Sequence, residues 1–267
     1  RDYLTRSPEE FSILLKAMQE SDAAHGLVRR AANRHLGKAD REAAGVLSSA
    51  QRHTHFLDSP RMSVTMATSD FSFADLKTQN ATVYLVLPPD RLAAYNRWLR
   101  LMVVETLQAL ARGPSPARPI LVLLDEFAAL GYLAPIEQAM GLMAGYGVQL
   151  WPILQDIHQL RAIYGKRADT FLANAGALQV FGVNDQETAK LVSDLLGQQT
   201  VQFETYSSST STNSSSSSTT QNFTGRALLM PDEVRALSGD YELLFLQGMR
   251  PIVARKIRYY ADGDFVG

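Results

Sequence analysis

Hydrophobic positions in the first 50 residues recur at helical spacing. Four of them fall on one face of a helix: Phe11, Leu14, Leu15 and Met18. The preceding run Ser7-Pro8-Glu9-Glu10 is typical of a helix start, with a capping side chain, then Pro and acids in the first turn. Gly26 and residues 37–40 interrupt the pattern. Residues 1–60 are therefore predicted to form a purely helical segment.

After Pro60 the pattern changes to short apolar runs that alternate with amphipathic stretches. The apolar runs predict buried strands at 81–87, 120–124, 148–154 and 177–182. The amphipathic stretches predict helices at 91–112, 134–146, 157–164 and 185–196. A short helix from Pro231 and a hairpin of 242–247 with 252–257 follow. Strands that alternate with helices predict an α/β domain over 61–267 with a mainly parallel sheet.

A low-complexity tract interrupts this domain. Ser207–Thr220 consists almost wholly of Ser and Thr, and it follows a strand-like run at 201–205. Such a tract has little apolar surface to offset the entropy lost on ordering. We therefore expect a mobile surface loop over 207–220.

Composition narrows the classes of function. The 267 residues are 46% hydrophobic, which is enough for a sizeable core. Lys and Arg (26) nearly balance Asp and Glu (27), so any contact with a polyanion must be local. The absence of Cys excludes disulfides, thiolate metal sites and a Cys nucleophile. No apolar stretch approaches the roughly 20 residues of a membrane helix, so we expect that this chain does not itself span a membrane. The sequence starts without Met, so we expect a piece of a longer protein.

The clearest chemical pattern is an apolar strand that ends in two carboxylates. Asp125 and Glu126 directly follow the predicted strand 120–124. Side chains at the carboxyl end of a central parallel strand face the crevice where α/β sheets bind ligands. In nucleotide hydrolases an Asp there holds Mg²⁺ and a Glu accepts a proton from the attacking water. The competing interpretation is that both acids begin the next helix as caps.

The next strand ends in a neutral amide. Gln155 follows the run at 148–154, and such an amide can sense a γ-phosphate or orient the attacking water. Its alternative role is to cap the helix from Ile157, for which Asp156 is equally suited. Together with Asp125 and Glu126, Gln155 favours a nucleotide site.

An ordered series of motifs resembles the type IV secretion coupling proteins, the conjugative ATPases of the TraG/TraD kind. The resemblance covers roughly residues 68–267. It rests on 122–127 with Gly131, 153–156 with Gln159-Leu160, Asn174-Ala175, 181–185 with Thr188-Ala189, and 226–234. The order of the motifs along the chain is more specific than any one of them.

The resemblance implies a RecA-like P-loop NTPase motor that assembles as a homo-hexamer at the cytoplasmic face of the bacterial inner membrane. It implies that ATP and Mg²⁺ are the cofactors, and that the motor translocates DNA with its relaxase, or effector proteins, to other type IV secretion components. Asp125 would be the magnesium-side carboxylate, Glu126 the catalytic base and Gln155 the phosphate sensor. Residues 1–60 would be part of the all-α domain that this family inserts into its motor.

Two departures from the family pattern affect this hypothesis. No G-x-x-x-x-G-K-[ST] phosphate loop occurs, because Gly37-Lys38 is followed by Ala39 in helical sequence. In this family the loop precedes the all-α insertion, so we expect this chain by itself to be inactive. Family members often carry an arginine between the two motif strands, where this chain has Gly145-Tyr146-Gly147. Arg161 and Arg167 are alternatives, or they are solvated surface residues, so the arginine finger stays unassigned.

Lys166 and Arg167 form a compact basic pair near the motif strands, and they either contact a DNA backbone or are solvated in a turn. Two other functions stay open. The chain could belong to another RecA-like DNA translocase or helicase. It could also be a non-catalytic module whose helical segment and Ser/Thr tract recruit substrates.

Overall fold

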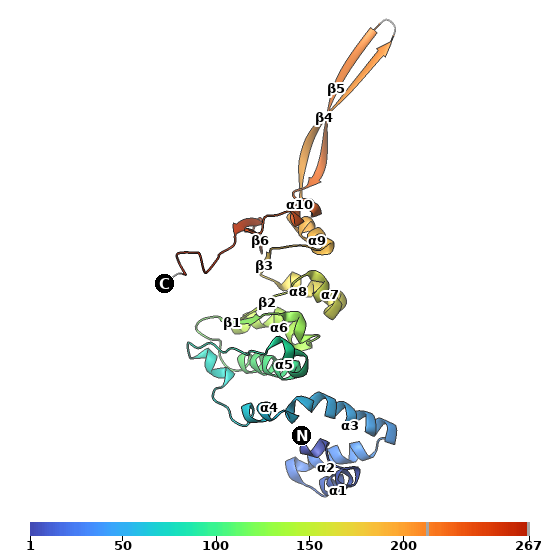
Figure 1. The fold of residues 1–267 in the computed structure, drawn as a ribbon, viewed down its shortest axis with the longest axis vertical. Helices are drawn as coiled ribbons and strands as arrows, with labels where there is room; N and C mark the ends of the chain where they lie inside the picture. The colour runs from blue at the N-terminus through green and yellow to red at the C-terminus, as the bar shows by residue number, and fades with distance from the viewer. Residues whose placement is uncertain (212–213, 266–267) are drawn as a thin grey trace. The chain divides into compact units, whose positions relative to one another are not determined.

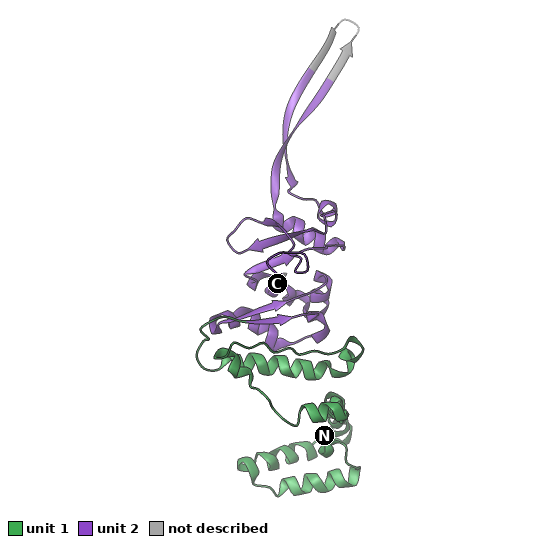
Figure 2. Cartoon of the chain, turned by 60° about the vertical axis from the view of Figure 1, so that its left-hand side comes forward, with its two compact units in different colours: residues 1–120 green, residues 121–267 purple. Residues whose placement is uncertain are grey.

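The computed structural model describes residues 1–211 and 214–265 (Figure 1). Two compact units divide the chain, Arg1–Ile120 and Leu121–Gly267 (Figure 2). No helix among the described residues is long and apolar enough to cross a membrane.

The first unit is helical, as predicted for its first 60 residues. Its elements are η1 (Asp2–Leu4), α1 (Pro8–Gln19), α2 (Ala23–Leu36), α3 (Asp40–Thr54), η2 (His55–Asp58), α4 (Pro60–Thr65), η3 (Phe73–Lys77) and α5 (Pro89–Ala111). Ser7 and Glu10 form a capping box at the start of α1: Ser7 Oγ accepts from Glu10 N at 3.3 Å, and Glu10 Oε2 accepts from Ser7 N at 3.1 Å. The sequence therefore specifies this helix start locally.

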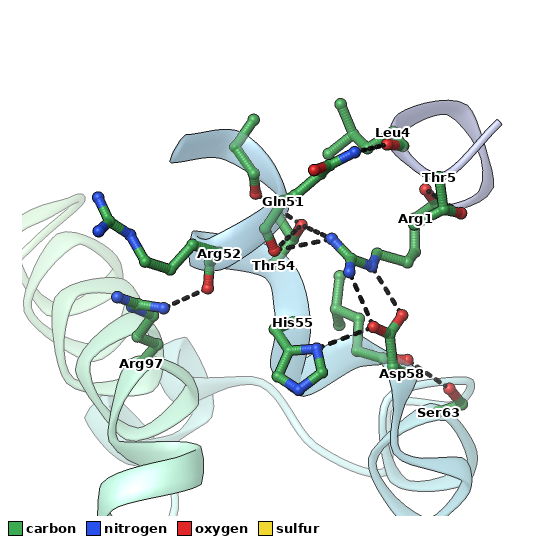
Figure 3. A network of polar contacts seen from close by, with 12 residues as sticks. Arg1, Leu4, Thr5, Gln51, Arg52, Thr54, His55, Asp58, Ser63 and Arg97 are labelled. Carbon is green, nitrogen blue, oxygen red and sulfur yellow. Dashed lines mark hydrogen bonds and ion pairs between the residues drawn. The ribbon is translucent and has the colours of Figure 1, made fainter. Parts of the chain in front are cut away.

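A polar network around Arg1 joins η1 to α3 and η2 (Figure 3). The Arg1 guanidinium donates to both oxygens of Asp58, at 2.7 and 2.8 Å, and to Gln51 O at 2.7 Å. His55 Nδ1 lies 3.0 Å from Asp58 Oδ2. The hydrogen bond from Arg1 lowers the pKa of the Asp58 carboxyl. The network therefore links the first residue of the chain to the end of α3 and to η2, and its bonds to Asp58 are charge-assisted.

The strand predicted at 81–87 is wrong. These residues belong to no helix or strand, and the side chains of Tyr84 and Val86 are 82% and 76% exposed. A β-branched apolar run favours extended backbone, but a strand also needs a neighbour to pair its amides and carbonyls. The composition of the run contains no information about that neighbour.

The second unit alternates strands and helices in the predicted order. Its first part contains β1 (Ile120–Leu124), η4 (Phe127–Leu130), α6 (Ala134–Leu142), η5 (Met143–Tyr146), β2 (Val148–Pro152), α7 (Ile157–Tyr164), η6 (Gly165–Arg167) and α8 (Ala168–Asn174). Its second part contains β3 (Ala177–Val180), α9 (Gln186–Leu196), β4 (Gln198–Ser211), β5 (Ser214–Ala227), α10 (Pro231–Arg235), β6 (Tyr241–Leu246) and β7 (Ile252–Arg255).

The strands form separate sheets of different direction. β1 and β2 pair in parallel. Ile153, directly after β2, donates its N–H to Leu124 O at 3.0 Å and accepts a bond from Phe127 N at 3.0 Å. A residue that bonds to an earlier and a later residue of the adjacent segment is typical of parallel pairing. β3, β6 and β7 form an antiparallel sheet in the order β3-β6-β7. The β6–β7 hairpin matches the prediction. The predicted polar residues Asp125, Glu126 and Gln155 follow the two strands of the parallel sheet.

Two apolar clusters hold the second unit together. Near the end of β1, Phe127 is fully buried against Tyr164 and Phe171, with ring centroids 5.9 and 5.8 Å away. The other cluster joins α9, α10 and β6 through Ala189, Val192, Val234 and Leu243. The first cluster fixes the chain immediately after β1 against α7 and α8, and so positions the residues between β1 and η4.

The expectation of a loop over Ser207–Thr220 is wrong for residues 207–211 and 214–220, which form strands. β4 and β5 pair antiparallel from Gln198 with Ala227 to Ser211 with Ser214, and residues 212–213 lie outside the described chain. Ser207 Oγ and Ser218 Oγ lie 2.8 Å apart. Cross-strand hydrogen bonds satisfy the backbone of a ribbon without any apolar core, a possibility that the compositional argument overlooked.

We expect Phe127→Ala to lower the free energy of unfolding by about 3–5 kcal/mol, since truncating a fully buried aromatic side chain leaves a cavity. Urea denaturation followed by circular dichroism measures this change. The control is Phe223→Ala on the 68% exposed side chain in β5, which should cost under about 1 kcal/mol. Equal losses for both variants would contradict the assignment of Phe127 to the core.

Asp185 caps α9, because its Oδ1 accepts from Thr188 N at 2.8 Å. Partial burial alone would raise the pKa of Asp185, but hydrogen bonds from Thr188 outweigh it and the pKa is lowered. The carboxylate thus stabilises the fold above its unfolded pKa of about 3.9 and loses this effect as the pH falls through the lower folded value. We expect Asp185→Ala to cost about 1 kcal/mol at pH 7 and less at pH 3. Urea unfolding at both pH values tests this, and a cost independent of pH would contradict it.

Candidate functional site

The predicted acid and amide lie together at one edge of the β1–β2 pair. Asp125 and Glu126 directly follow β1, and Gln155 follows β2. Because the two strands are parallel, both ends lie at the same edge. Gln155 Nε2 donates to Glu126 Oε1 at 3.2 Å. Asp125 is the neighbour of Glu126, and its Oδ1 accepts from Glu126 N at 3.1 Å.

The backbone of Glu126 is left-handed, with φ 48° and ψ 46°. This conformation is uncommon for a residue with a Cβ and costs about 1 kcal/mol or more. Phe127 holds it, since its N–H donates to Ile153 O at 3.0 Å and its ring is fully buried. Glu126 precedes η4 but makes no side-chain cap bond to it. The capping interpretation is therefore not supported for Glu126, whose carboxylate is engaged by Gln155.

Capping of α7 falls to Asp156, whose Oδ1 accepts from Gln159 N at 2.8 Å. From the sequence, Gln155 and Asp156 were equally good caps. The structure separates their tasks: Asp156 satisfies the helix start, and the Gln155 side chain extends to Glu126 instead. The amide is thereby left at the edge of the sheet with an exposed carboxylate beside it.

The donor set suits a magnesium–nucleotide complex better than a metal held by protein alone. Asp125, Glu126 and Gln155 are all exposed. Within residues 1–211 and 214–265, no group of three or more His, Cys, Asp or Glu side chains could hold a metal ion. Mg²⁺ bound through nucleotide phosphates needs only one or two carboxylates from the protein. Asp125 and Glu126 fit that smaller requirement.

Two of the three basic residues that the sequence analysis considered, Arg161, Lys166 and Arg167, pair with acids. Arg167 Nη1 lies 2.7 Å from the Tyr132 hydroxyl and 3.4 Å from Glu137 Oε2, and the bond to Glu137 raises the pKa of Arg167. Arg161 pairs with Glu187. Both candidates for an arginine finger thus have partners within the chain, and the finger stays unassigned. Lys166 is exposed in η6.

Sequence reasoning missed the contacts that support Gln155. Gln159 appeared only as part of the family resemblance, yet its side-chain Oε1 accepts from Gln155 N at 3.1 Å. Thr188 Oγ1 accepts from Ile157 N at 3.2 Å, which ties the start of α7 to α9. The spacing of Asp156 and Gln159 as N-cap and third helical residue was the available signal for the first contact.

Known proteins share both the sequence pattern and the fold. The family described as type IV secretory system conjugative DNA transfer matches residues 6–266. Protein VirD4 of Agrobacterium fabrum (strain C58 / ATCC 33970) is 34% identical over 210 residues, 76% of this chain and 31% of VirD4. Conjugal transfer protein TraG of Rhizobium radiobacter is 31% identical over 224 residues, 83% of this chain and 35% of TraG. The chain spans about a third of the length of these relatives.

Solved structures of the plasmid coupling protein TrwB are similar in three dimensions. The unbound monoclinic form of TrwBdeltaN70 matches with a TM-score of 0.65 at 23% identity, covering 82% of this chain and 51% of that chain. TrwB in complex with ADP and Mg²⁺ matches with a TM-score of 0.65 at 20% identity, covering 92% and 59%. The likeness shows that this chain shares the fold of the TrwB structures, in line with the predicted α/β domain. The resemblance found in the sequence is also confirmed: the chain belongs to the type IV secretory system conjugative DNA transfer family.

Proposed function

We propose that this chain forms part of the ATP-hydrolysing motor of a type IV secretion coupling protein, which recruits DNA–protein or effector substrates and translocates them to the secretion channel. The observation that carries the proposal is the hydrogen bond between Gln155 and Glu126 at the ends of two parallel strands. Family membership favours a coupling protein over other RecA-like translocases. The intact acid–amide pair favours a working site over a non-catalytic recruiting module.

In this proposal each side chain at the strand ends has one task. Asp125 would hold Mg²⁺, which when bound neutralises charge on the β- and γ-phosphates. Glu126 accepts the proton of the attacking water. Gln155 donates its amide to Glu126 in the structure, and the same N–H group can orient the water or contact the γ-phosphate. The left-handed backbone of Glu126 keeps its carboxylate at the sheet edge.

The proposed context of the motor follows its family. We propose that ATP and Mg²⁺ are its cofactors, since TrwB has been solved in complex with a non-hydrolysable ATP analogue and with ADP and Mg²⁺. We also propose that it works as a homo-hexamer with other type IV secretion components, on DNA with its relaxase or on effector proteins. It would act at the cytoplasmic face of the inner membrane, anchored by a segment outside this chain. Residues 1–60 would be part of the inserted all-α domain.

We expect Glu126→Gln in the full-length protein to reduce kcat for ATP hydrolysis by about 100-fold or more, because Gln cannot accept the proton. Affinity for ATP should change less than about threefold, since the substitution keeps the shape of the side chain. Steady-state phosphate release and nucleotide titration measure the two quantities. Glu105→Gln, on an exposed residue of α5, is the matched control. Unchanged turnover in Glu126→Gln would remove this residue from the reaction.

Residues 1–267 alone, which contain no phosphate loop, are expected to show no magnesium-dependent turnover. Measurable magnesium-dependent ATP hydrolysis by this chain, abolished by Glu126→Gln, would contradict that expectation.

The basic pair provides a separate prediction about DNA. Lys166 is exposed, whereas Arg167 is already held by Glu137, so we propose that Lys166 makes the larger contribution to any backbone contact. Lys166→Ala should weaken single-stranded DNA binding and reduce the slope of log K against log salt by about 0.7. Fluorescence anisotropy at several salt concentrations measures the slope. The control is Lys190→Ala, on an exposed residue of α9. Equal slopes in both variants would exclude a contact at Lys166.

A further inference from the structure

The side chain of Gln159 reaches back over the start of α7 to the backbone of Gln155. Gln159 Oε1 accepts a hydrogen bond from Gln155 N at 3.1 Å. In turn, Gln159 N donates to Asp156 Oδ1 at 2.8 Å. Gln159 therefore contacts the N-cap residue and the residue before it, with its backbone bound to Asp156 and its side chain bound to Gln155.

This arrangement is a capping box displaced by one residue. In the usual box, the side chain of the third helical residue accepts from the N–H of the N-cap residue. Here the third helical residue is Gln159 and the N-cap is Asp156, yet Gln159 accepts from the residue before the N-cap. The side chain of Gln159 therefore restrains Gln155 itself, whose amide bonds to Glu126.

The first turn of α7, which carries Gln159, is held against α9 by two contacts. Ile157 is buried, and its N–H donates to Thr188 Oγ1 at 3.2 Å. His158 Nδ1 lies 2.8 Å from Glu187 Oε2 on α9. The first turn of α7 is thus tied to α9 by two contacts, so a side chain projecting from that turn has a defined origin.

The Gln155 side chain needs such a restraint. Gln155 and Glu126 are both exposed, and water competes for the 3.2 Å bond between them. A Gln side chain has several rotatable bonds, so fixing its backbone reduces the conformations that separate its amide from Glu126. A misplacement of about 1 Å at a reacting group can cost a factor of 100 in rate.

We propose that Gln159 is a positioning residue that holds the backbone of Gln155 so that its side-chain amide stays directed at Glu126. Gln159 acts only through Gln155. The inference rests on the proposed function as an ATPase, and it specifies how the amide of that site is kept in place.

The test uses the full-length protein with three substitutions. Gln159→Met removes the acceptor and keeps the length of the side chain. Gln159→Glu keeps an acceptor oxygen, and an acid in the first turn of a helix is favourable. Gln186→Met is the matched control: Gln186 is an exposed first-turn residue of α9, and its side chain makes no hydrogen bond within the described residues.

The first measurement is hydrogen exchange of the peptide that contains Gln155, without nucleotide. Gln159→Met should speed exchange of that peptide at least about fivefold, since the Gln155 N–H loses its acceptor, while the melting temperature stays unchanged. Gln159→Glu should keep the slow exchange, and Gln186→Met should leave the peptide unaffected. Exchange that is unchanged in Gln159→Met would overturn the proposal, whatever the activity of the site.

The second measurement is ATP turnover by the same variants. Gln159→Met should lower kcat by about 10- to 100-fold with KM changed less than about threefold, and Gln159→Glu should recover most of the loss. Faster exchange with unchanged kcat would overturn the positioning role while leaving the proposed function intact. If Glu126→Gln also left turnover unchanged, the proposed function itself would fail. The two failures are therefore distinguishable.

Discussion

The site depends on the backbone pairing at the ends of β1 and β2. Ile153 bonds to Leu124 on one side and to Phe127 on the other, both at 3.0 Å. These two bonds set the parallel direction and the relative position of the strand ends. Asp125 and Glu126 lie between the two residues that bond to Ile153, and Gln155 lies two residues after Ile153. Without this pairing, a carboxylate and an amide 29 residues apart in sequence would not meet.

Apolar packing stabilises a backbone conformation that the acid pair alone would not adopt. Glu126 has a left-handed backbone, and the fully buried ring of Phe127 follows it directly. Burying such a ring contributes about 1.5–3 kcal/mol, which is enough to offset a left-handed residue that costs about 1–3 kcal/mol. The stacked contact with Tyr164 links this turn to the far end of α7. The helix after the amide therefore also anchors the turn that carries the acid.

Two neighbouring polar residues after β2 have different partners, one at the start of α7 and one at Glu126. Asp156 satisfies the helix start, which leaves Gln155 free to contact Glu126. Gln159 then restrains Gln155 from within the helix. Contacts from Thr188 and Glu187 tie the same turn to α9, and α9 leads through Gly197 into the β4–β5 ribbon.

The sequence by itself determined the helices, most strands and the acid–amide pair, because these depend on local periodicity, caps and the residues at strand ends. Tertiary structure decided what depends on a distant neighbour. The run 81–87 is unpaired despite its strand-like composition, the Ser/Thr tract pairs across a ribbon, and β3 pairs antiparallel with β6. It also decided that Arg161 and Arg167 meet Glu187 and Glu137, and that Gln159 holds Gln155. Pattern along one segment specifies its conformation and its apolar face, but a hydrogen-bond or ion-pair partner is specified only when the fold brings the second group within about 3 Å.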